Sequence, residues 1–292
     1  MNLKRVSEAL DILDRAYSHW RPSWIFLLYS GGYDSVCSTH IAWAWAKAAG
    51  IEHKVKVISA DTGVAADGWR DYVARVSRSE GWRHEIWDNP NPEFYFENTR
   101  EYGFPYTREM HWKIMYRNLK ERTIDALRAA HKSNRRDRCM LVTGMRRDES
   151  DERANTPEWL EDGAGLWVSP LVNWSDVDIL EYRVSHGFEP NPFYETVGGS
   201  GDCECNWGQF TDLETIEKYS PILGAKIRPV HEHCLDKFKY GYGERASDAL
   251  ISERAGQMLL EGVEPIMNLC ATCSRAKPDG SRAAEWRDLQ SW

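Results

Sequence analysis

The stretch Ser30–Ser35 (Ser-Gly-Gly-Tyr-Asp-Ser) has residue types and spacing that suit phosphate chemistry. It follows the apolar run 24–29 and leads into a helix-compatible segment, Asp34 to Lys47. Paired glycines let backbone N–H groups converge on an oxyanion without a Cβ in the way, and the following helix adds the positive end of its dipole. The residues predicted to bind phosphate are Ser30, Gly31, Gly32, Asp34 and Ser35.

The same residues match the pattern SGGxDS and thereby resemble the PP-loop ATP pyrophosphatases, adenine nucleotide alpha hydrolase-like enzymes that include the PAPS reductases. No Gly-Lys-Ser/Thr follows the glycines, so the loop is not a Walker A motif. The resemblance implies a Rossmann-like α/β fold of the PP-loop or HUP type. It also implies ATP, or the sulfonucleotides PAPS or APS, as ligand, together with Mg²⁺.

A second polar segment, Asp61-Thr62-Gly63, follows the predicted strand 54–60. A strand that delivers a carboxylate and a hydroxyl beside the first strand is how open α/β sheets form a ligand crevice. The PAPS reductase family carries a similar acidic-Thr-Gly element here, although a simple turn and N-cap is the alternative. We expect Asp61, Thr62 and Gly63 to contribute to nucleotide binding, and Asp34 or Asp61 to hold Mg²⁺.

An arginine-rich segment, 144–154, follows the apolar strand 138–143 and resembles the family's G-x-R-x-x-x-S-x-x-R-A motif. Guanidinium groups bind phosphate or sulfate oxygens in a planar fork, whereas a charged, solvated loop is the alternative. The residues expected to act are Gly144, Arg146 and Arg147 in binding, and Ser30, Asp34, Arg146 and Arg153 in catalysis.

Five of the seven cysteines lie beyond residue 200, as a Cys-x-Cys, a single Cys and a Cys-x-x-Cys. These are enough thiols for a four-thiolate site. Cluster-containing relatives imply a [4Fe–4S] cluster, which we prefer, while Zn²⁺ is the alternative because His231 and His233 flank Cys234. Unmetallated thiols are a third interpretation. The predicted ligands are Cys203, Cys205, Cys234, Cys270 and Cys273.

Alternating helical and strand periodicities indicate the elements that must position these residues. The predicted helices are 3–19, 36–49, 67–80, 111–130 and one capped by Ser175 or Asp176, the predicted strands are 24–29, 54–60, 81–87, 138–143 and 166–171, and 88–110 is a long irregular segment. We therefore predict a parallel sheet flanked by helices in a nucleotide-binding domain, residues 1–200. A small helical, cysteine-containing lobe, residues 201–292, follows it.

Composition bounds the remaining possibilities. The 292 residues are 42% hydrophobic and 28% charged, as in ordinary globular proteins. No run approaches a membrane span, and the N-terminus lacks the apolar core of a secretion signal, so we expect a cytoplasmic protein. The net charge of -8 argues against indiscriminate coating of nucleic acid. Lys132–Arg138 is a local basic patch, which we interpret first as a solvated loop.

The function that these features favour is ATP binding and cleavage between the α and β phosphates, to adenylate an acceptor, with sulfur transfer as one use. PAPS or APS reduction is an alternative, although Arg275–Trp292 lacks the family's Glu-Cys-Gly-x-His segment. A nucleotide-binding accessory of a phage, plasmid or CRISPR-associated system is another. The expected partners are an adenine nucleotide and a nucleic-acid or protein acceptor, with a homodimer left open.

Overall fold

The computed structural model describes residues 2–106, 110–134, 136–150, 153–206, 211–244 and 246. The backbone forms two compact units. The first contains Met1–Ala60, Gly68–Trp87 and Ile124–Asn191, and the second contains Asp61–Asp67, Asp88–Thr123 and the described residues from Pro192 onward. The chain therefore passes between the two units several times. The division into domains 1–200 and 201–292 stays a prediction.

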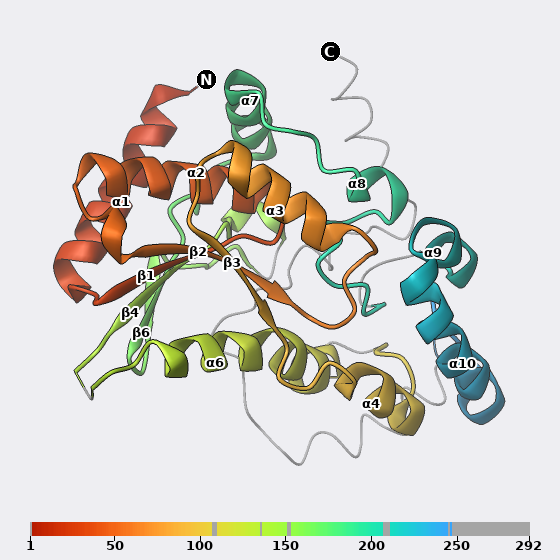
Figure 1. The fold of residues 1–292 in the computed structure, drawn as a ribbon. Coiled ribbons are helices and arrows are strands. Elements are labelled where there is room, and N and C mark those ends of the chain that lie inside the picture. The colour runs from red at the N-terminus through yellow and green to blue at the C-terminus, as the bar shows by residue number, and fades with distance from the viewer. Residues whose placement is uncertain are drawn as a thin grey trace. The chain divides into compact units, whose positions relative to one another are not determined.

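A six-stranded sheet forms the centre of the first unit, in the order β3-β2-β1-β4-β6-β5 (Figure 1). β1 pairs in parallel with both β2 and β4, and β4 pairs in parallel with β6, whereas β5 is antiparallel to β6. The strands are β1 (Trp24–Leu28), β2 (Val55–Asp61), β3 (His84–Asp88), β4 (Cys139–Val142), β5 (Trp159–Asp162) and β6 (Gly165–Val168). The predicted α/β class with a parallel sheet is confirmed, and the short antiparallel strand β5 was not anticipated.

Helices cover both faces of this sheet because β1 and β4 are apolar throughout and must be buried on both sides. Figure 1 shows α1, α2 and α3 on one face and α6 on the other. Ser175 caps α7 in a capping box with Asp178, as the sequence predicted. The helices of this unit are α1 (Leu3–Trp20), α2 (Tyr33–Ala48), α3 (Trp69–Ser79), α6 (Arg122–Ala130, which begins at the unit boundary) and α7 (Asp176–His186), with short 3₁₀ turns η1 (Glu52–Lys54) and η3 (Arg147–Glu149).

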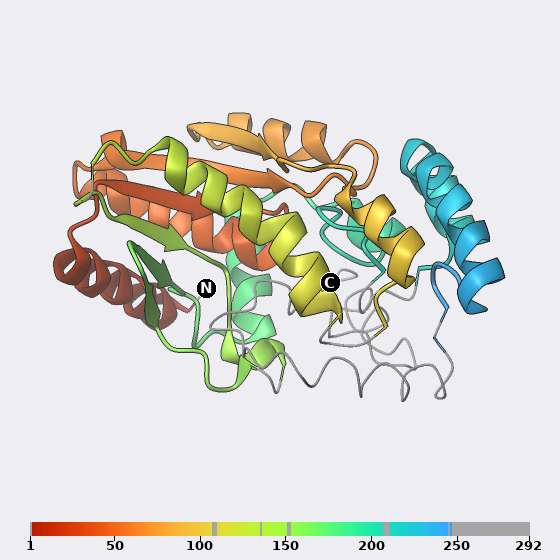
Figure 2. The same ribbon diagram turned by 90° about the horizontal axis from the view of Figure 1, so that it is seen from below.

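The second unit is mainly helical in its described part. α9 (Leu213–Tyr219) and α10 (Pro221–Phe238) pack against each other, and α10 also packs against α4 (Phe94–Tyr102). Figure 2 shows α10 lying alongside these two helices. The unit also holds the π-type helix η2 (His111–Glu121) and α8 (Phe193–Thr196). The expectation that 88–110 is irregular throughout is wrong, because α4 occupies its centre with Tyr95 and Phe96 buried.

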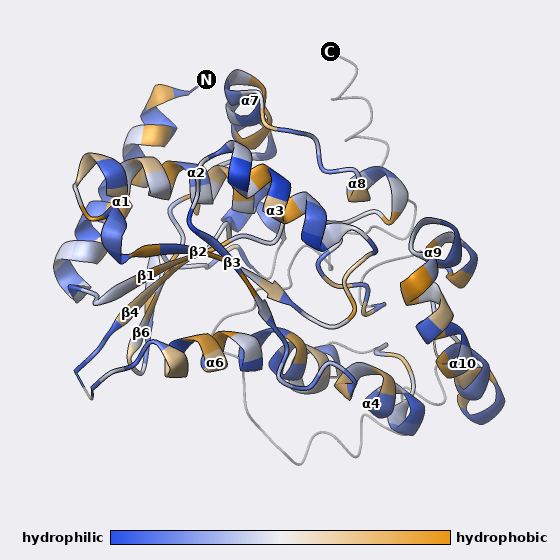
Figure 3. Cartoon of the chain, in the orientation of Figure 1, coloured by the Kyte–Doolittle hydropathy of each residue, from blue (hydrophilic) through white to orange (hydrophobic). Residues whose placement is uncertain are grey.

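Hydropathy follows burial, and in Figure 3 β1 and β4 are mainly hydrophobic while the surrounding helices also carry hydrophilic residues. Ile25, Phe26 and Leu27 of β1 are completely buried, as are Met140 and Leu141 of β4. In the part of the chain that the structure describes, no helix is both long and apolar enough to cross a membrane.

Candidate functional site

The loop between β1 and α2 holds its own serine side chains in a compact arrangement. Ser35 Oγ donates to the carbonyl of Gly32 at 2.8 Å and lies 3.1 Å from Ser30 Oγ. Ser30 Oγ in turn accepts from the Gly32 N–H at 3.3 Å. The N-cap of α2 is Gly32, so no capping side chain covers the start of the helix. This is the local geometry of an oxyanion-binding loop, with two hydroxyls and a helix N-terminus converging.

Gly31 sits at the turn of this loop with φ of +88°, a conformation that residues with a Cβ rarely adopt. A Cβ there would also lie 3.2 Å from Val73 Cγ1 and 3.3 Å from Tyr72 Cε1. Two side chains from other elements bind the loop carbonyls. Asn191 Nδ2 donates to Gly31 O at 2.8 Å, and Trp69 Nε1 donates to Ser30 O at 2.8 Å. Because its carbonyls are held by these two side chains, the backbone of the loop is fixed.

Arg146 is fully buried behind the loop, with 0% of its surface exposed. Its Nε and Nη2 bind the two carboxylate oxygens of Asp34 at 3.0 and 3.2 Å, and Nη2 also binds Asp176 Oδ1 at 2.7 Å. Burial alone would lower the pKa of Arg146, but the carboxylates of Asp34, Glu149 and Asp176 outweigh it and raise that pKa. The guanidinium therefore fixes Asp34, and the structure gives Arg146 a positioning role.

Gly144 allows the turn after β4 to approach the first turn of α2. A Cβ on Gly144 would lie 2.7 Å from the Asp34 carbonyl carbon and 2.8 Å from Ser35 N, both of them backbone atoms. Such distances are not tolerated without a shift of the backbone. The predicted binding residue Gly144 is thus placed directly against Asp34 and Ser35.

The other arginines of segment 144–154 lie in different surroundings. Arg153 is buried and ion-paired with Glu149, whose carboxylate also accepts from the Arg146 N–H at 3.1 Å. Arg147 is exposed, and its side chain binds Thr156 O at 2.9 Å and Asn173 Oδ1 at 2.7 Å. The structure therefore brings Gly144 and Arg146 to the loop, while Arg147 bonds to Thr156 and Asn173 instead.

Asp61, Thr62 and Gly63 belong to the second unit. Asp61 Oδ1 accepts from the Gly63 N–H at 2.8 Å, which is the turn geometry that the sequence offered as the alternative. Thr62 is completely buried, and its hydroxyl donates to Asp202 O at 2.7 Å. Thr62 thus ties the segment after β2 to the cysteine segment, a connection that its sequence position did not indicate.

The cysteine segment, residues 201–206, is buried along its whole length. Its backbone pairs with the segment after β2, since Ala66 N–H donates to Gly201 O and Glu204 N–H donates to Val64 O, both at 2.8 Å. Lys120 Nζ binds Asp202 Oδ2 at 2.7 Å. A hydrogen bond from Cys205, aided by Lys120, lowers the pKa of the Cys203 thiol despite its burial.

Three predicted metal ligands act on the hydroxyl of Tyr95. Burial is the first cause that raises the pKa of this hydroxyl, and the charges of Cys205, Cys203 and Cys234 raise it further. Glu204 acts on Tyr95 in the same sense; it is completely buried, and neither carboxyl oxygen has a hydrogen-bond partner in the described chain. Cys270 and Cys273 lie outside the described residues. Within those residues no group of three His, Cys, Asp or Glu side chains is arranged to hold a metal.

Three residues of the loop's surroundings were missed by sequence reasoning. Asn191 belongs to the proline-rich segment 190–194, Pro-Asn-Pro-Phe-Tyr, whose composition predicts only a turn, and Asp176 was expected only as a possible helix cap. Trp69 had no signal beyond being one of fourteen tryptophans. An asparagine preceding a proline in a motif shared with a family was the one usable clue, since amide side chains commonly bind loop backbone.

Comparison with known families agrees with this arrangement. The family model described as the phosphoadenosine phosphosulfate reductase domain matches residues 24–206, a span that includes the loop, segment 144–154 and the Cys203–Cys205 pair. That span is more than half of the 292 residues, and the chain belongs to this family. The prediction of a PAPS reductase-like protein is confirmed.

Individual relatives are similar over shorter stretches. The adenosine 5'-phosphosulfate reductase of Streptomyces coelicolor is 44% identical over 63 residues, 20% of this chain and 27% of that protein. An uncharacterized protein of Escherichia phage 186 is 40% identical over 63 residues, 20% of this chain and 19% of that protein. The similarity thus spans about a quarter or less of these relatives' length. A Candida auris PAPS reductase structure in complex with phosphate aligns with a TM-score of 0.44 and 14% identity, covering 64% of this chain and 83% of that one.

Proposed function

We propose that the chain binds ATP, or a related adenine nucleotide, through the loop Ser30–Ser35 and cleaves the bond between the α and β phosphates. An oxygen of the acceptor would attack the α phosphorus, the bond from that phosphorus to the bridging oxygen would break, and pyrophosphate would leave. The acceptor becomes an adenylate, and with water as acceptor the products are AMP and pyrophosphate. The observation that carries this proposal is the glycine loop whose carbonyls are held by Asn191 and Trp69.

In this proposal Ser30, Gly31, Gly32 and Ser35 bind phosphate oxygens, and the serine hydroxyls and the Gly32 N–H exchange their bonds within the loop for bonds to phosphate. Arg146 acts through Asp34: its guanidinium occupies both carboxylate oxygens, so Asp34 is fixed beside the loop. Mg²⁺, when bound, would neutralise phosphate charge, and Asp34 or Asp61 would hold it.

The cysteines would hold a metal centre of the family's kind. Thiolates are ligands of [4Fe–4S] clusters and of Zn²⁺ alike, and Cys203, Cys205 and Cys234 share the surroundings of Tyr95. Burial and the neighbouring Cys203 raise the pKa of the Glu204 carboxyl group, so it stays protonated and adds no negative charge beside thiolate ligands. A bound cluster would supply electron-transfer or Lewis-acid chemistry. Metal analysis and an absorption spectrum of anaerobically purified protein distinguish iron from zinc.

The names of the relatives favour a second candidate, reduction of PAPS or APS. A thiolate would attack the sulfur of the sulfonucleotide, releasing the nucleotide, and thioredoxin would then reduce the enzyme thiosulfonate and release sulfite. The thiol expected to make this attack is Cys273, which lies outside the described residues. Thioredoxin-dependent sulfite release from PAPS or APS by the parent, lost in Cys273→Ser, supports reduction over adenylation.

The test of the main proposal is release of AMP and pyrophosphate from ATP and Mg²⁺. Ser30→Ala and Ser35→Ala remove the two hydroxyls of the loop, and each is expected to lower turnover at least tenfold. Ser79→Ala is the matched control, because Ser79 is an exposed serine of α3 whose hydroxyl bonds only within its own helix. Equal turnover in the loop variants and in the control would contradict the proposal.

A further inference from the structure

A pocket of about 280 Å³ lies in the first unit at the sheet edge opposite the nucleotide loop. Trp24 and Cys139, which line it, are the first residues of β1 and β4 and are register partners. The nucleotide loop follows the other end of β1, which is five residues long. At about 3.3 Å per residue the two sites are separated by roughly 16 Å of strand. The pocket is therefore distinct from the nucleotide loop.

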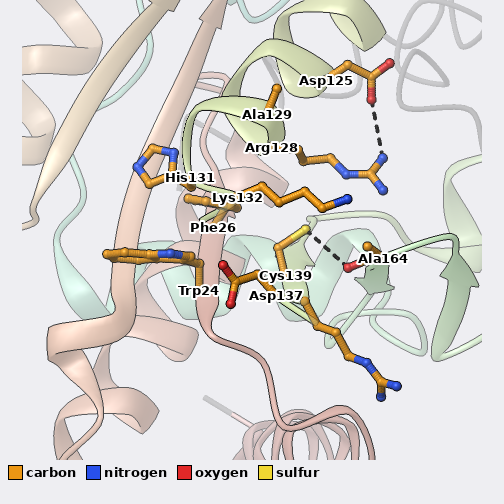
Figure 4. Close-up of a pocket in the computed structure, with 11 residues that line it drawn as sticks. Trp24, Phe26, Asp125, Arg128, Ala129, His131, Lys132, Asp137, Cys139 and Ala164 are labelled. Carbon is orange, nitrogen blue, oxygen red and sulfur yellow. Dashed lines mark hydrogen bonds and ion pairs between the residues drawn. The ribbon is translucent and has the colours of Figure 1, made fainter. Parts of the chain in front are cut away.

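Basic side chains dominate the rim of this pocket. Arg128, Lys132 and Arg138 all line it, and Lys132 and Arg138 are exposed. Figure 4 shows the side chains of Arg128 and Lys132 extending in the same direction above Cys139. Neither Lys132 nor Arg138 forms an ion pair within the described part of the chain, although Arg138 lies 4.7 Å from the centre of the Trp20 ring. The rim thus holds two cations that no carboxylate neutralises, in a chain of net charge -8.

The two carboxylates of the pocket are already occupied. Asp125 Oδ1 accepts from Arg128 Nη1 at 3.3 Å. Asp137 accepts from Ser133 N and Oγ at 2.8 and 2.6 Å and from Asn134 N and Nδ2 at 3.0 Å. These donors lower the pKa of Asp137 to about 2. Neither carboxylate pairs with Lys132 or Arg138, so the lining of three cations and two carboxylates keeps an excess of one positive charge for a ligand.

Aromatic rings line another side of the pocket. Trp24 is half-buried, and the ring of His131 packs edge-on against it with the ring centres 5.2 Å apart. Lys56 Nζ also lies 5.7 Å from the centre of the Trp24 ring. His131 Nδ1 donates to Leu127 O at 3.0 Å, which fixes the orientation of the imidazole. The Trp24 ring is consequently held in one position by its neighbours. Cations beside a fixed aromatic ring are the combination with which proteins bind nucleotides, since the ring stacks on a base and the cations bind phosphate.

We propose that this pocket binds one nucleotide unit, with its base at Trp24 and its phosphate at Lys132 and Arg138. A volume of about 280 Å³ suits a single unit and is too small for a dinucleotide. The unit comes either from a free nucleotide or from a single strand of nucleic acid. The proposal does not depend on the function of the loop Ser30–Ser35. It gives the basic segment 132–138 a role in binding.

The test measures the affinity of the full chain for AMP by calorimetry and for a labelled twelve-nucleotide oligothymidylate by fluorescence anisotropy. The double variant Lys132→Gln/Arg138→Gln removes both unpaired cations from exposed positions, so folding should be unaffected. It is expected to weaken binding of the proposed ligand at least tenfold. For the strand, the slope of log affinity against log salt concentration should become shallower by about 1.4, because two phosphate contacts are lost. Trp24→Leu should weaken binding about tenfold.

Two controls separate this pocket from other binding. Lys218→Gln changes an exposed lysine of α9 that also lies against an aromatic ring, Tyr219, at 4.9 Å. Ser30→Ala changes the nucleotide loop. Loss of AMP affinity in the double variant, but not in Ser30→Ala, identifies a free nucleotide as ligand. Loss of affinity for the oligonucleotide alone identifies a strand. If the double variant binds both probes as Lys218→Gln does, the proposal is overturned.

Discussion

The loop Ser30–Ser35 and the cysteine segment 201–206 are both buried polar segments, yet they satisfy their polar groups in opposite ways. In the loop the serine hydroxyls bond within the loop, and the Asp34 carboxylate has the Arg146 guanidinium. In the cysteine segment the backbone is paired, but the Glu204 carboxylate is buried without a hydrogen-bond partner in the described chain. Buried polar groups without partners are rare because each is costly.

This difference indicates that the loop satisfies its polar groups without a ligand, whereas the cysteine segment does not. A loop with satisfied side chains and held carbonyls is preorganised, so a nucleotide gains affinity without reordering the chain. In the cysteine segment burial raises the pKa of Glu204 and keeps its carboxyl group neutral, and a metal bound by the thiols would stabilise the folded chain that presents them. We therefore expect substitutions near the loop to act on stability directly, and substitutions in the cysteine segment to act through metal.

The largest effect is expected for Arg146→Ala. Removing the guanidinium leaves the carboxylates of Asp34 and Asp176 without this partner, and breaking a buried ion pair from one side costs about 3–5 kcal/mol. Urea unfolding at pH 7 measures the change. Arg147→Ala is the control, because Arg147 is exposed and should change stability by about 0.5 kcal/mol or less. A loss of unfolding free energy below about 1 kcal/mol for Arg146→Ala would contradict the claim that Arg146 holds Asp34 and Asp176 in place.

Metal removal gives the next effect. Protein carrying its metal is expected to be stabilised by about 3 kcal/mol when the free metal is at 100 times its dissociation constant. A chelator should therefore lower the melting temperature of the parent. The double variant Cys203→Ser/Cys205→Ser should bind less metal and respond less to the chelator, whereas Cys37→Ser, a buried thiol of α2, should retain the parent's metal content. Equal metal content in all three proteins contradicts the assignment.

Gly144→Ala tests the close approach behind the loop. The added Cβ meets the backbone of Asp34 and Ser35 rather than a flexible side chain, so the turn after β4 must move. Overpacking of this kind costs about 1–3 kcal/mol. Thermal unfolding measures that loss, and a lower affinity for ATP should accompany it because the moved turn is in contact with the loop. Parent-like stability and affinity would show that the contact is unimportant.

The smallest effect concerns His84 of β3. Ser59 Oγ donates to Tyr29 O at 2.6 Å, so it accepts from His84 Nε2 at 2.8 Å, and burial lowers the pKa of His84 to about 4. Below the unfolded pKa of about 6.5 the unfolded chain takes up a proton that the native chain does not, so stability falls as pH falls toward 4. Allowing for partial exposure, His84 accounts for about 1 kcal/mol at pH 5.

His84→Gln keeps a donor for Ser59 and removes the titration. Urea unfolding at pH 7 and pH 5 should show a smaller loss for His84→Gln than for the parent. His53→Gln is the control, since His53 is exposed at η1. Parallel losses in the parent and His84→Gln would mean that His84 titrates normally in the native protein.

Much of the fold could be predicted because the hydrophobic periodicity and the turn and cap residues were unambiguous. The apolar run 24–29 and Gly31-Gly32 identify β1, its turn and α2, and Ser175 identifies the start of α7. α4 was missed because its aromatic residues carry no clean helical period, and β5 because a four-residue edge strand has too few residues to show alternation.

Only part of the candidate site could be predicted from the sequence. The residue types of Ser30, Gly31 and Arg146 pointed to phosphate, but no local pattern indicated that Arg146 would be buried against Asp34. A guanidinium binds a carboxylate as well as it binds a phosphate, so only tertiary contacts decide between the two. Likewise Asn191 lies 160 residues from Gly31 in sequence, and no local pattern could join them.

The most direct test of the central claim, that the loop after β1 binds nucleotide phosphate, is the calorimetric affinity of Gly31→Ala for ATP with Mg²⁺. Gly50→Ala is its matched control, because Gly50 also has positive φ, +69°, but a Cβ there meets nothing within 4 Å. Both variants carry similar backbone strain, of the order of 1 kcal/mol. We predict at least a tenfold loss of ATP affinity in Gly31→Ala and none in Gly50→Ala. Equal affinity in the two variants would contradict the account.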